Sequence, residues 1–193
     1  MDFLLSVCLG VGLAAACGFR VFVPLLGLSI AAHGGHVELA HNMEWIASWP
    51  AMLCFLTATI LEVAGYYVPW IDHLLDTVAS PAAVIAGSVA TASVVQDLSP
   101  FLRWTLALIA GGGLACLIQT ATVGLRGTST TTTAGLGNFV VSTFELVLSL
   151  AVTVLSIIAP IATALVIALL VGVAVRIVAN RRQRKLTKKV TAA

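Results

Sequence analysis

Four charged residues stand within or at the edge of long apolar stretches of the sequence: Arg20, Glu62, Arg126 and Glu145. A charge at the centre of a membrane-spanning helix costs about 2.5–3.5 kcal/mol, so such a side chain should face the protein interior, pair or line water. We expect Arg126 to pair with either Glu62 or Glu145. Two interpretations remain open, a polar pathway in which a glutamate takes up a proton and an ion pair that only fixes helix packing.

Asp72 and Asp76 form a second group that could do chemistry. They are four residues apart and therefore lie on one face of a helix, where two carboxylates could contact a divalent cation. Metal-assisted lipid chemistry would need a second acidic motif, which the sequence lacks, so a short interfacial helix with its acids in water is the simpler interpretation. The histidines of residues 33–41 match no strong metal-binding spacing. We expect no bound metal and no cofactor.

Composition limits the class of protein that carries these charges. The chain has 193 residues, of which 60% are hydrophobic and 9% charged, and its mean hydropathy is +1.07. Soluble domains have roughly 45–50% apolar and about 25% charged residues. An ordinary water-soluble enzyme is therefore excluded. We expect an all-α, polytopic transmembrane helical bundle with a single membrane domain over residues 1–179.

The apolar stretches predict about six membrane segments. Residues 3–32 are too long for one crossing, and we expect a helix break between Gly18 and Pro24 because glycine loosens a helix and proline removes a backbone donor. Residues 46–68 follow, and the aromatic residues at their ends, Tyr66 among them, are typical of membrane interfaces. Residues 82–95 are short and rich in small residues, which favours an interior helix or a re-entrant segment that starts at Pro81.

The second half of the chain has a polar interruption of its own. Residues 101–123 should span the membrane, and the polar run from Gly124 to Asn138 should break the helix again. Residues 139–179 are long enough for two spans, which we place on either side of Ala159–Pro160. A faint similarity of the two halves, residues 1–97 and 98–179, suggests an inverted repeat of three segments each.

Charge is distributed very unevenly along the chain. Residues 1–175 contain three arginines and eight acids, whereas the last 18 residues contain seven basic residues. Such an excess of Lys and Arg predicts a cytoplasmic side, so residues 180–193 are interpreted as a basic cytoplasmic tail. With six spans the N-terminus is also inside and residues 33–44 are outside. We expect a bacterial inner-membrane protein whose tail contacts anionic lipid head groups, with no nucleic-acid partner; a homo-oligomeric pore is one arrangement.

Three motifs carry a resemblance to a known family: Gly18-Phe19-Arg20-x3-Pro24, Glu62-x6-Pro69-x2-Asp72-x3-Asp76 and Gly137-Asn138-x6-Glu145. In this order they resemble the bacterial membrane family called domain of unknown function 4126, over nearly the whole chain up to the basic tail. The chain departs from the family pattern at Tyr66 and Phe139, where an acid and a proline are common. The resemblance implies a membrane protein and supplies no activity.

Three hypotheses of function follow from the sequence. The first is a small transporter or channel-like protein with a buried Arg/Glu polar site near the two helix breaks. The second is a non-catalytic accessory or scaffold membrane subunit whose charges form structural ion pairs. The third is a lipid-directed, metal-dependent enzyme that uses Asp72 and Asp76, although an enzyme is not our main expectation.

Overall fold

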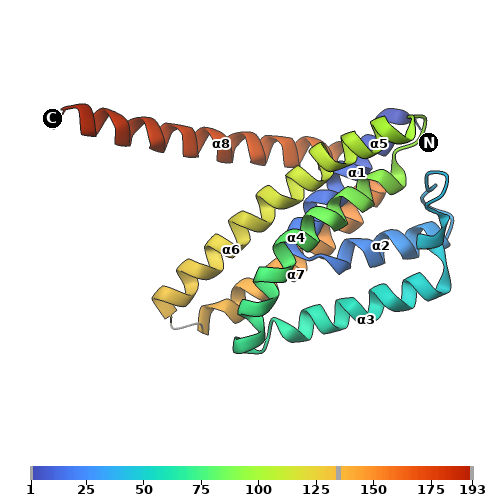
Figure 1. The fold of residues 1–193 in the computed structure, drawn as a ribbon, viewed down its shortest axis with the longest axis horizontal. Helices are drawn as coiled ribbons and strands as arrows, with labels where there is room; N and C mark the ends of the chain where they lie inside the picture. Colours follow the sequence, from blue (N-terminus) through green and yellow to red (C-terminus); the bar gives the residue numbers. More distant parts are fainter. Residues whose placement is uncertain (1, 134–135, 192–193) are drawn as a thin grey trace.

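Helices account for nearly all of the computed structural model, which describes residues 2–133 and 136–191. These ranges contain no strand, and the expected all-α class is confirmed. In chain order the elements are α1 (Phe3–Phe19), α2 (Phe22–His33), the 3₁₀ turn η1 (Glu44–Ala47), α3 (Trp49–Gly65), α4 (Pro69–Val94), α5 (Pro100–Leu106), the π-helical stretch η2 (Ala107–Gly112), α6 (Gly113–Thr133), α7 (Leu136–Ile158) and α8 (Pro160–Thr191) (Figure 1).

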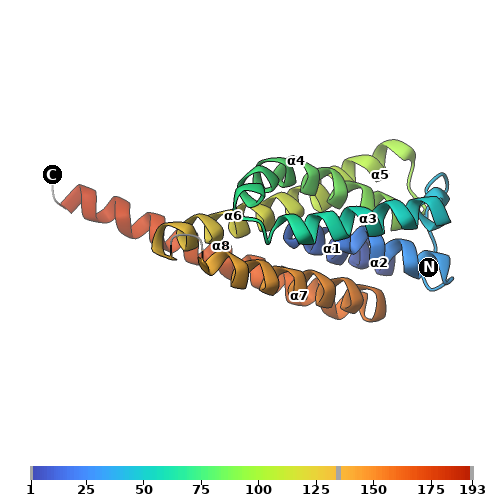
Figure 2. The same cartoon turned by 90° about the horizontal axis from the view of Figure 1, so that it is seen from below.

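The bundle has two different ends (Figures 1 and 2). One end, which we call the loop end, carries the N-terminus, the loop of residues 34–43 and the starts of α5 and α8. At the opposite end α3 meets α4, and the end of α6 lies beside the start of α7. Helix α1 occupies the centre, where it contacts α2, α4, α6, α7 and α8. The C-terminal part of α8 extends away from the other helices (Figures 1 and 2).

Helices α1 and α2 are two parts of one apolar segment that turns back at Arg20. Pro24 lies in the first turn of α2, and in an unbroken helix its ring would clash with the carbonyl group of Arg20, four residues earlier. Arg20 is instead extended, with φ −144° and ψ 129°. The helix is thus interrupted between Gly18 and Pro24, where the sequence predicts a break. Both outer ends of the α1–α2 pair lie at the loop end (Figure 1).

Gly18 has a role other than loosening the helix. It is the next-to-last residue of α1. A Cβ atom at this position would lie 2.6 Å from Cβ of Ile118 and 2.8 Å from the carbonyl oxygen of Ala115, both on α6. The missing side chain therefore allows α1 and α6 to approach closely, as small residues do between membrane helices.

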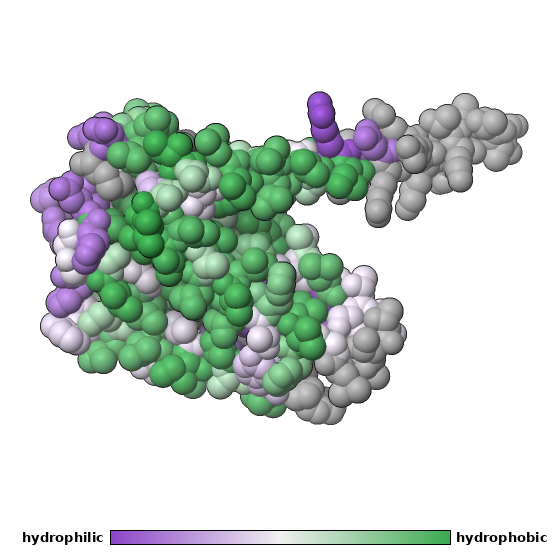
Figure 3. Space-filling model, turned by 180° about the vertical axis from the view of Figure 1, so that it is seen from behind, coloured by the Kyte–Doolittle hydropathy of each residue, from purple (hydrophilic) through white to green (hydrophobic). Residues whose placement is uncertain are grey.

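The outside of the bundle is apolar, and part of its interior is polar. Large apolar side chains are exposed on the long helices, for example Leu61, Ile85, Phe144 and Leu165. Figure 3 shows an apolar surface over the middle of the molecule, with hydrophilic side chains gathered at the loop end. Soluble monomers rarely expose an apolar area of this extent. The chain is therefore a multi-pass membrane protein.

Four helical stretches are long and apolar enough to cross a membrane: Leu74–Val94, Pro100–Thr131, Gly137–Ile158 and Pro160–Ile177. Helices α1, α2 and α3 are apolar but shorter, with 17, 12 and 17 residues. The predicted number of six segments stays a prediction. The last two stretches meet at Ala159–Pro160, where the sequence places the boundary between two spans.

The expected start of the helix over residues 82–95 is wrong. The sequence predicts a short helix over residues 82–95 that starts at Pro81, but α4 already begins at Pro69 and contains Pro81 in its interior. Pro69 occupies the first turn of α4, where a missing N–H costs nothing because the first N–H groups of a helix have no partner within it. Residues 72–76, expected in a separate interfacial helix, therefore belong to the long helix α4.

The helix break expected between Gly124 and Asn138 does not start at Gly124, because α6 continues through this residue to Thr133 and α7 begins at Leu136. Hydroxyl groups in this stretch donate to carbonyl groups one turn back, as Thr128 does to Leu125 and Thr130 does to Arg126. Threonines bonded in this way can remain in a helix at membrane depth. Residues 124–133 of the polar run are consequently helical.

The two chain ends lie on different sides of the bundle. The N-terminus and the loop of residues 34–43 share the loop end because α1 and α2 form a hairpin (Figure 1), whereas six crossings would place them on opposite membrane sides, which stays a prediction. Residues 180–191, interpreted as a tail, continue α8 as a helix.

The two halves of the chain differ at the residues that suggested a repeat, since Arg20 lies at an interruption and Arg126 within a continuous helix. The inverted repeat stays a prediction.

Candidate functional site

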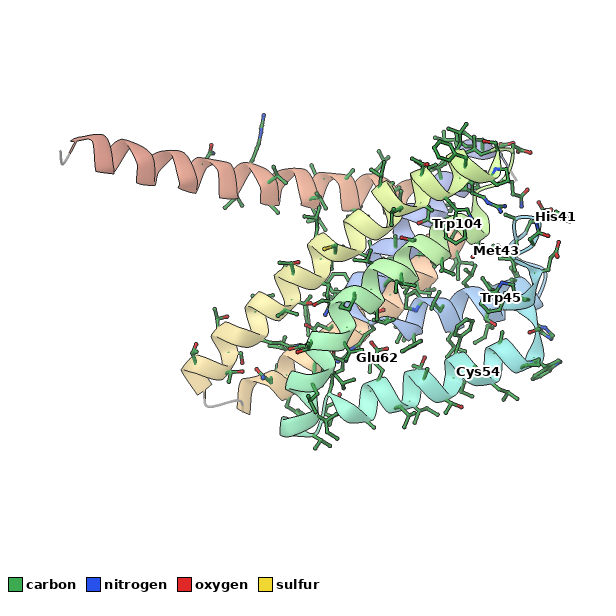
Figure 4. All side chains as sticks on the ribbon, in the orientation of Figure 1. His41, Met43, Trp45, Cys54, Glu62 and Trp104 are labelled. Carbon is green, nitrogen blue, oxygen red and sulfur yellow. The ribbon has the colours of Figure 1, made fainter. Side chains whose placement is uncertain are left out.

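Five charged side chains from separate elements come together inside the bundle, in the half away from the loop end. We call them the charge cluster: Arg20 at the α1–α2 interruption, Glu62 on α3, Asp76 on α4, Arg126 on α6 and Glu145 on α7. Asp76 exposes 13% of its side chain, and the other four residues expose between 1% and 6% of their surface. Figure 4 shows Glu62 among the helices, away from His41 and Trp45 at the loop end.

Glu62 caps the start of α2. Its Oε1 atom accepts a hydrogen bond from the N–H of Val21 at 2.8 Å, and its Oε2 atom accepts one from the N–H of Phe22 at 3.0 Å. The first N–H groups of a helix lack partners within the helix and carry partial positive charge, so a carboxylate satisfies and stabilises them. In a bilayer each unsatisfied group would cost several kcal/mol. Glu62 therefore makes the interruption tolerable inside the bundle.

Arg126 is bound by two carboxylates. Its Nε atom donates to Oε1 of Glu145 at 3.2 Å, and its Nη2 atom donates to Oε2 of the same residue. Its Nη1 atom donates to Oδ1 of Asp76 at 2.5 Å. Of the two partners considered from the sequence, the hydrogen-bonded one is Glu145. This forked contact fixes α4, α6 and α7 relative to one another, because a guanidinium fork matches a carboxylate in geometry as well as in charge.

Arg20 is only partly satisfied. Its Nη2 atom donates to the carbonyl oxygen of Ser142 at 2.9 Å and to the hydroxyl of the same residue at 2.5 Å, and it lies 3.9 Å from Oε2 of Glu145. The Nε and Nη1 atoms are buried and have no hydrogen-bond partner within the part of the chain that the structure describes. A buried donor left unsatisfied costs about 1–3 kcal/mol. Arg20 is therefore hydrogen-bonded to α7 through a single nitrogen atom.

The ring of Tyr66 contacts both arginines of the charge cluster. The Cζ atoms of Arg20 and Arg126 each lie 3.9 Å from the centroid of its ring. Such cation–π contacts contribute about 2 kcal/mol when desolvated, and Tyr66 is only 5% exposed. The interpretation of Tyr66 as an interfacial aromatic residue is therefore wrong. The ring brings together two guanidinium groups that would otherwise repel each other.

The helix that carries Glu145 has a polar face toward α1. Buried hydroxyl residues recur at intervals of seven along α7 and into α8, at Ser142, Ser149, Ser156 and Thr163. Ser149 donates to the carbonyl oxygen of Ala16 at 3.1 Å. Small hydroxyl side chains allow helices to pack closely and to bond across the interface. This row of hydroxyl residues extends the polar interior from the charge cluster toward the loop end.

Of the other residues singled out from the sequence, Asp76 belongs to the charge cluster. Asp76, expected beside a cation, is bonded to Arg126, and the side chain of Asp72 lies outside the described residues. Gly124 is in mid-helix, and Nδ2 of Asn138 donates to the hydroxyl of Thr130 at 2.9 Å, which joins α7 to α6. Within the described ranges no three His, Cys, Asp or Glu side chains are grouped so that they could hold a metal ion.

Two members of the site are not identified by the sequence reasoning, Ser142 and Tyr66. A signal exists for Ser142, because it precedes Glu145 by three residues and therefore lies on the same helix face. A corresponding signal exists for Tyr66, which follows Glu62 by four residues. Neither spacing reveals that Ser142 and Tyr66 both contact Arg20, which is distant in the sequence.

The charge cluster contains two guanidinium groups and three carboxyl groups. The groups it brings together are cationic N–H donors, carboxyl groups and the N–H groups at the start of a helix. One family model, described as "domain of unknown function (DUF4126)", matches residues 7–180. No curated protein and no solved structure matches the chain.

Proposed function

Because the chain belongs to the family described as a domain of unknown function (DUF4126), a description that names no activity, we propose its function from the charge cluster. The protein is a small transporter or channel-like protein that binds a polar solute or an ion at the interruption between α1 and α2. Interrupted helices expose backbone groups and helix ends, which is how many transporters hold their substrates.

The state of Arg20 carries this proposal. An arginine that served packing alone would be expected to have its donors satisfied, because buried polar groups in native proteins almost always are. Arg20 is 1% exposed, and its Nε and Nη1 atoms lack partners among the described residues. Groups kept unsatisfied at a cost in stability are typical of functional sites. A bound solute would supply the missing acceptors.

We place the protein in a bacterial inner membrane, with its C-terminus in the cytoplasm, because the Lys and Arg residues concentrate there. The α1–α2 pair is then a re-entrant segment that enters from the outer side and returns to it. Arg126 precedes the end of its span, Thr131, by five residues, or about 8 Å of helix. The charge cluster thus lies nearer the cytoplasmic surface, where the basic residues of α8 would meet anionic lipids.

Sidedness of the hairpin can be measured with single cysteines in a chain whose four native cysteines have been replaced. Asp2→Cys and His36→Cys should react with a membrane-impermeant thiol reagent from the same side, and Thr131→Cys from the other. Labelling of positions 2 and 36 from opposite sides would contradict the re-entrant arrangement.

Water access to the site tests the transport proposal itself. Ser142→Cys keeps the size of the side chain beside Arg20 and places a thiol in the site. If an open state is populated at about 1%, this cysteine should react about a hundredfold more slowly than Thr131→Cys, but measurably. Ala14→Cys is the control, since Ala14 is fully buried on α1 away from the charges and should stay protected. Equal protection at positions 142 and 14 in folded protein would contradict a polar pathway.

One observation favours the accessory-subunit role as a second candidate. Arg126 is fully engaged by Glu145 and Asp76, as a structural ion pair would be. Complete protection of Ser142→Cys, together with loss of folding on neutralising Glu145, would support that role instead.

A further inference from the structure

We propose that the start of α2 and the side chain of Arg20 form a binding site for a small planar monovalent anion, a carboxylate or nitrate, and that Glu62 occupies this site as an internal ligand. The proposal deepens the function proposed above by naming its ligand class. The role of the bound anion as a transported solute rests on that proposed function. Binding of the anion can be measured without any transport assay.

The geometry at the start of α2 selects the shape of the ligand. The two carboxylate oxygens of Glu62 each accept one N–H, from Val21 at 2.8 Å and from Phe22 at 3.0 Å. A free carboxylate or nitrate has two oxygens in the same planar arrangement and can make the same two bonds. A halide is a single atom and cannot present a separate acceptor to each N–H. The site therefore fits a planar oxyanion better than a spherical one.

Arg20 supplies the second, independent indication of a ligand. It directly precedes the start of α2, it is 1% exposed, and its Nε and Nη1 atoms have no partner within the described chain. Its guanidinium group attracts the Glu62 carboxylate electrostatically, yet no hydrogen bond joins the two side chains among the described residues. Glu62 is tethered to α3, whereas a free anion is not. A free anion can therefore satisfy the start of α2 and the donors of Arg20 together.

The charge of the cluster stays balanced when a free anion replaces the Glu62 carboxylate at the start of α2. With every group ionised, the two arginines and three acids of the charge cluster leave one excess negative charge. When Glu62 leaves the site it takes up a proton from the aqueous phase, an O–H bond forms on its carboxyl group, and the arriving anion replaces the lost charge. The total buried charge is then unchanged, which avoids the cost of an uncompensated buried ion.

The surroundings of Glu62 determine how this exchange depends on pH. Arg20 and Arg126 attract its carboxylate, the thiol of Cys17 lies within electrostatic range, and Tyr66 directly follows the end of α3, four residues after Glu62. Asp76 and Glu145 complete the cluster through Arg126. One proton should therefore be bound with each anion, and binding to the wild-type protein should weaken as the pH rises.

Removal of the internal ligand is the sharpest test. Glu62→Ala leaves the N–H groups of Val21 and Phe22 without an acceptor, so a free planar anion should restore the lost stability. Thermal unfolding of the purified full chain in detergent is measured by tryptophan fluorescence with 100 mM formate, nitrate or chloride. For a dissociation constant of about 10 mM, formate and nitrate should raise the Tm of Glu62→Ala by about 4 °C. Chloride should raise it by less than half as much, and the wild-type Tm should barely change at neutral pH.

Two further variants serve as controls. Glu44→Ala removes an exposed acid from η1 and reports general salt effects. Adding Arg20→Lys to Glu62→Ala should reduce the formate effect severalfold, because lysine cannot present the same donors. If Glu62→Ala does not fold, Glu62→Gln replaces it: its amide offers one acceptor oxygen and no charge, so formate should stabilise it more than it stabilises the wild type.

Equal shifts in Glu62→Ala and Glu44→Ala, equal effects of chloride and formate, or no shift in folded protein would each overturn the anion site. If the site fails while Ser142→Cys is accessible to water, the transport proposal stands with another ligand. If anions bind while Ser142→Cys is fully protected, the site stands and transport is refuted.

Discussion

Glu145→Gln should lower the free energy of unfolding by about 3 kcal/mol, and this cost should depend on Arg126. Glu145 accepts hydrogen bonds from two nitrogens of Arg126, lies 3.9 Å from Arg20 and is 3% exposed. Removing one partner of a buried ion pair costs about 3–5 kcal/mol, because the other charge remains buried. Asp76 stays bonded to Arg126 in this variant, so we expect the lower end of that range.

The dependence on Arg126 is measured with a double-mutant cycle. Arg126→Gln alone should cost at least as much as Glu145→Gln. The double variant should cost about 3–4 kcal/mol, well below the sum of the two single variants, with a coupling energy of about 2–3 kcal/mol. Unfolding can be followed in detergent by the reaction of Cys17 with a thiol dye, since Cys17 is fully buried and becomes reactive only when α1 is released. The other three cysteines, Cys8, Cys54 and Cys116, are replaced beforehand.

A control pair separates the ion pair from general loss of charge. Glu62 bonds to the backbone of α2, so Glu62→Gln and Arg126→Gln should combine much more nearly additively. Additive costs for Glu145→Gln and Arg126→Gln, or equal coupling in both cycles, would refute the reasoning from the forked contact.

Two other predictions concern the packing of α1 against Ser156 and the contacts of Tyr66. Gly12→Ala would place a Cβ atom 2.8 Å from Cβ of Ser156 and still closer to its hydroxyl, so it should destabilise the protein by about 2 kcal/mol in thermal unfolding. Ser156→Gly should restore most of this loss, and Gly113→Ala, which has open space around its Cβ position, should have little effect. Tyr66→Leu should cost about 2 kcal/mol because the ring faces both arginines. Tyr66→Phe should cost less than half as much, and equal losses in the two variants would contradict the cation–π contacts.

Local rules of helix chemistry predict much of the fold. Pro24 and Arg20 are four residues apart, and this spacing alone places the first interruption. Proline at Pro160 likewise marks a helix start. The second break does not start at Gly124 as predicted, because the threonine hydroxyls that follow bond within α6, which ends only at Thr133. Composition cannot distinguish such a stretch from a loop.

The candidate site was predictable only in part, because its contacts join distant parts of the chain. The rule that buried charges must be paired gives Arg126 either Glu62 or Glu145 as a partner, and only the structure shows that the contact is with Glu145. It does not reveal that Glu62 caps α2, since this requires knowing that α2 starts inside the bundle and next to α3. Tyr66 looks like an interfacial aromatic residue from its position at the end of an apolar span. Its burial follows from the depth to which the α1–α2 hairpin reaches.

The contacts of Arg20 set an order for biosynthesis. Ser142, whose hydroxyl and carbonyl groups it binds, lies 122 residues later in the chain, so a ribosome working at about 5–20 residues per second needs about 6–24 s to supply it. Glu62 is available much sooner, 41 residues after Val21. During that interval the start of α2 can be capped while Arg20 still lacks its partners on α7. The first helices to leave the ribosome should therefore be the last to settle at their final depth in the membrane.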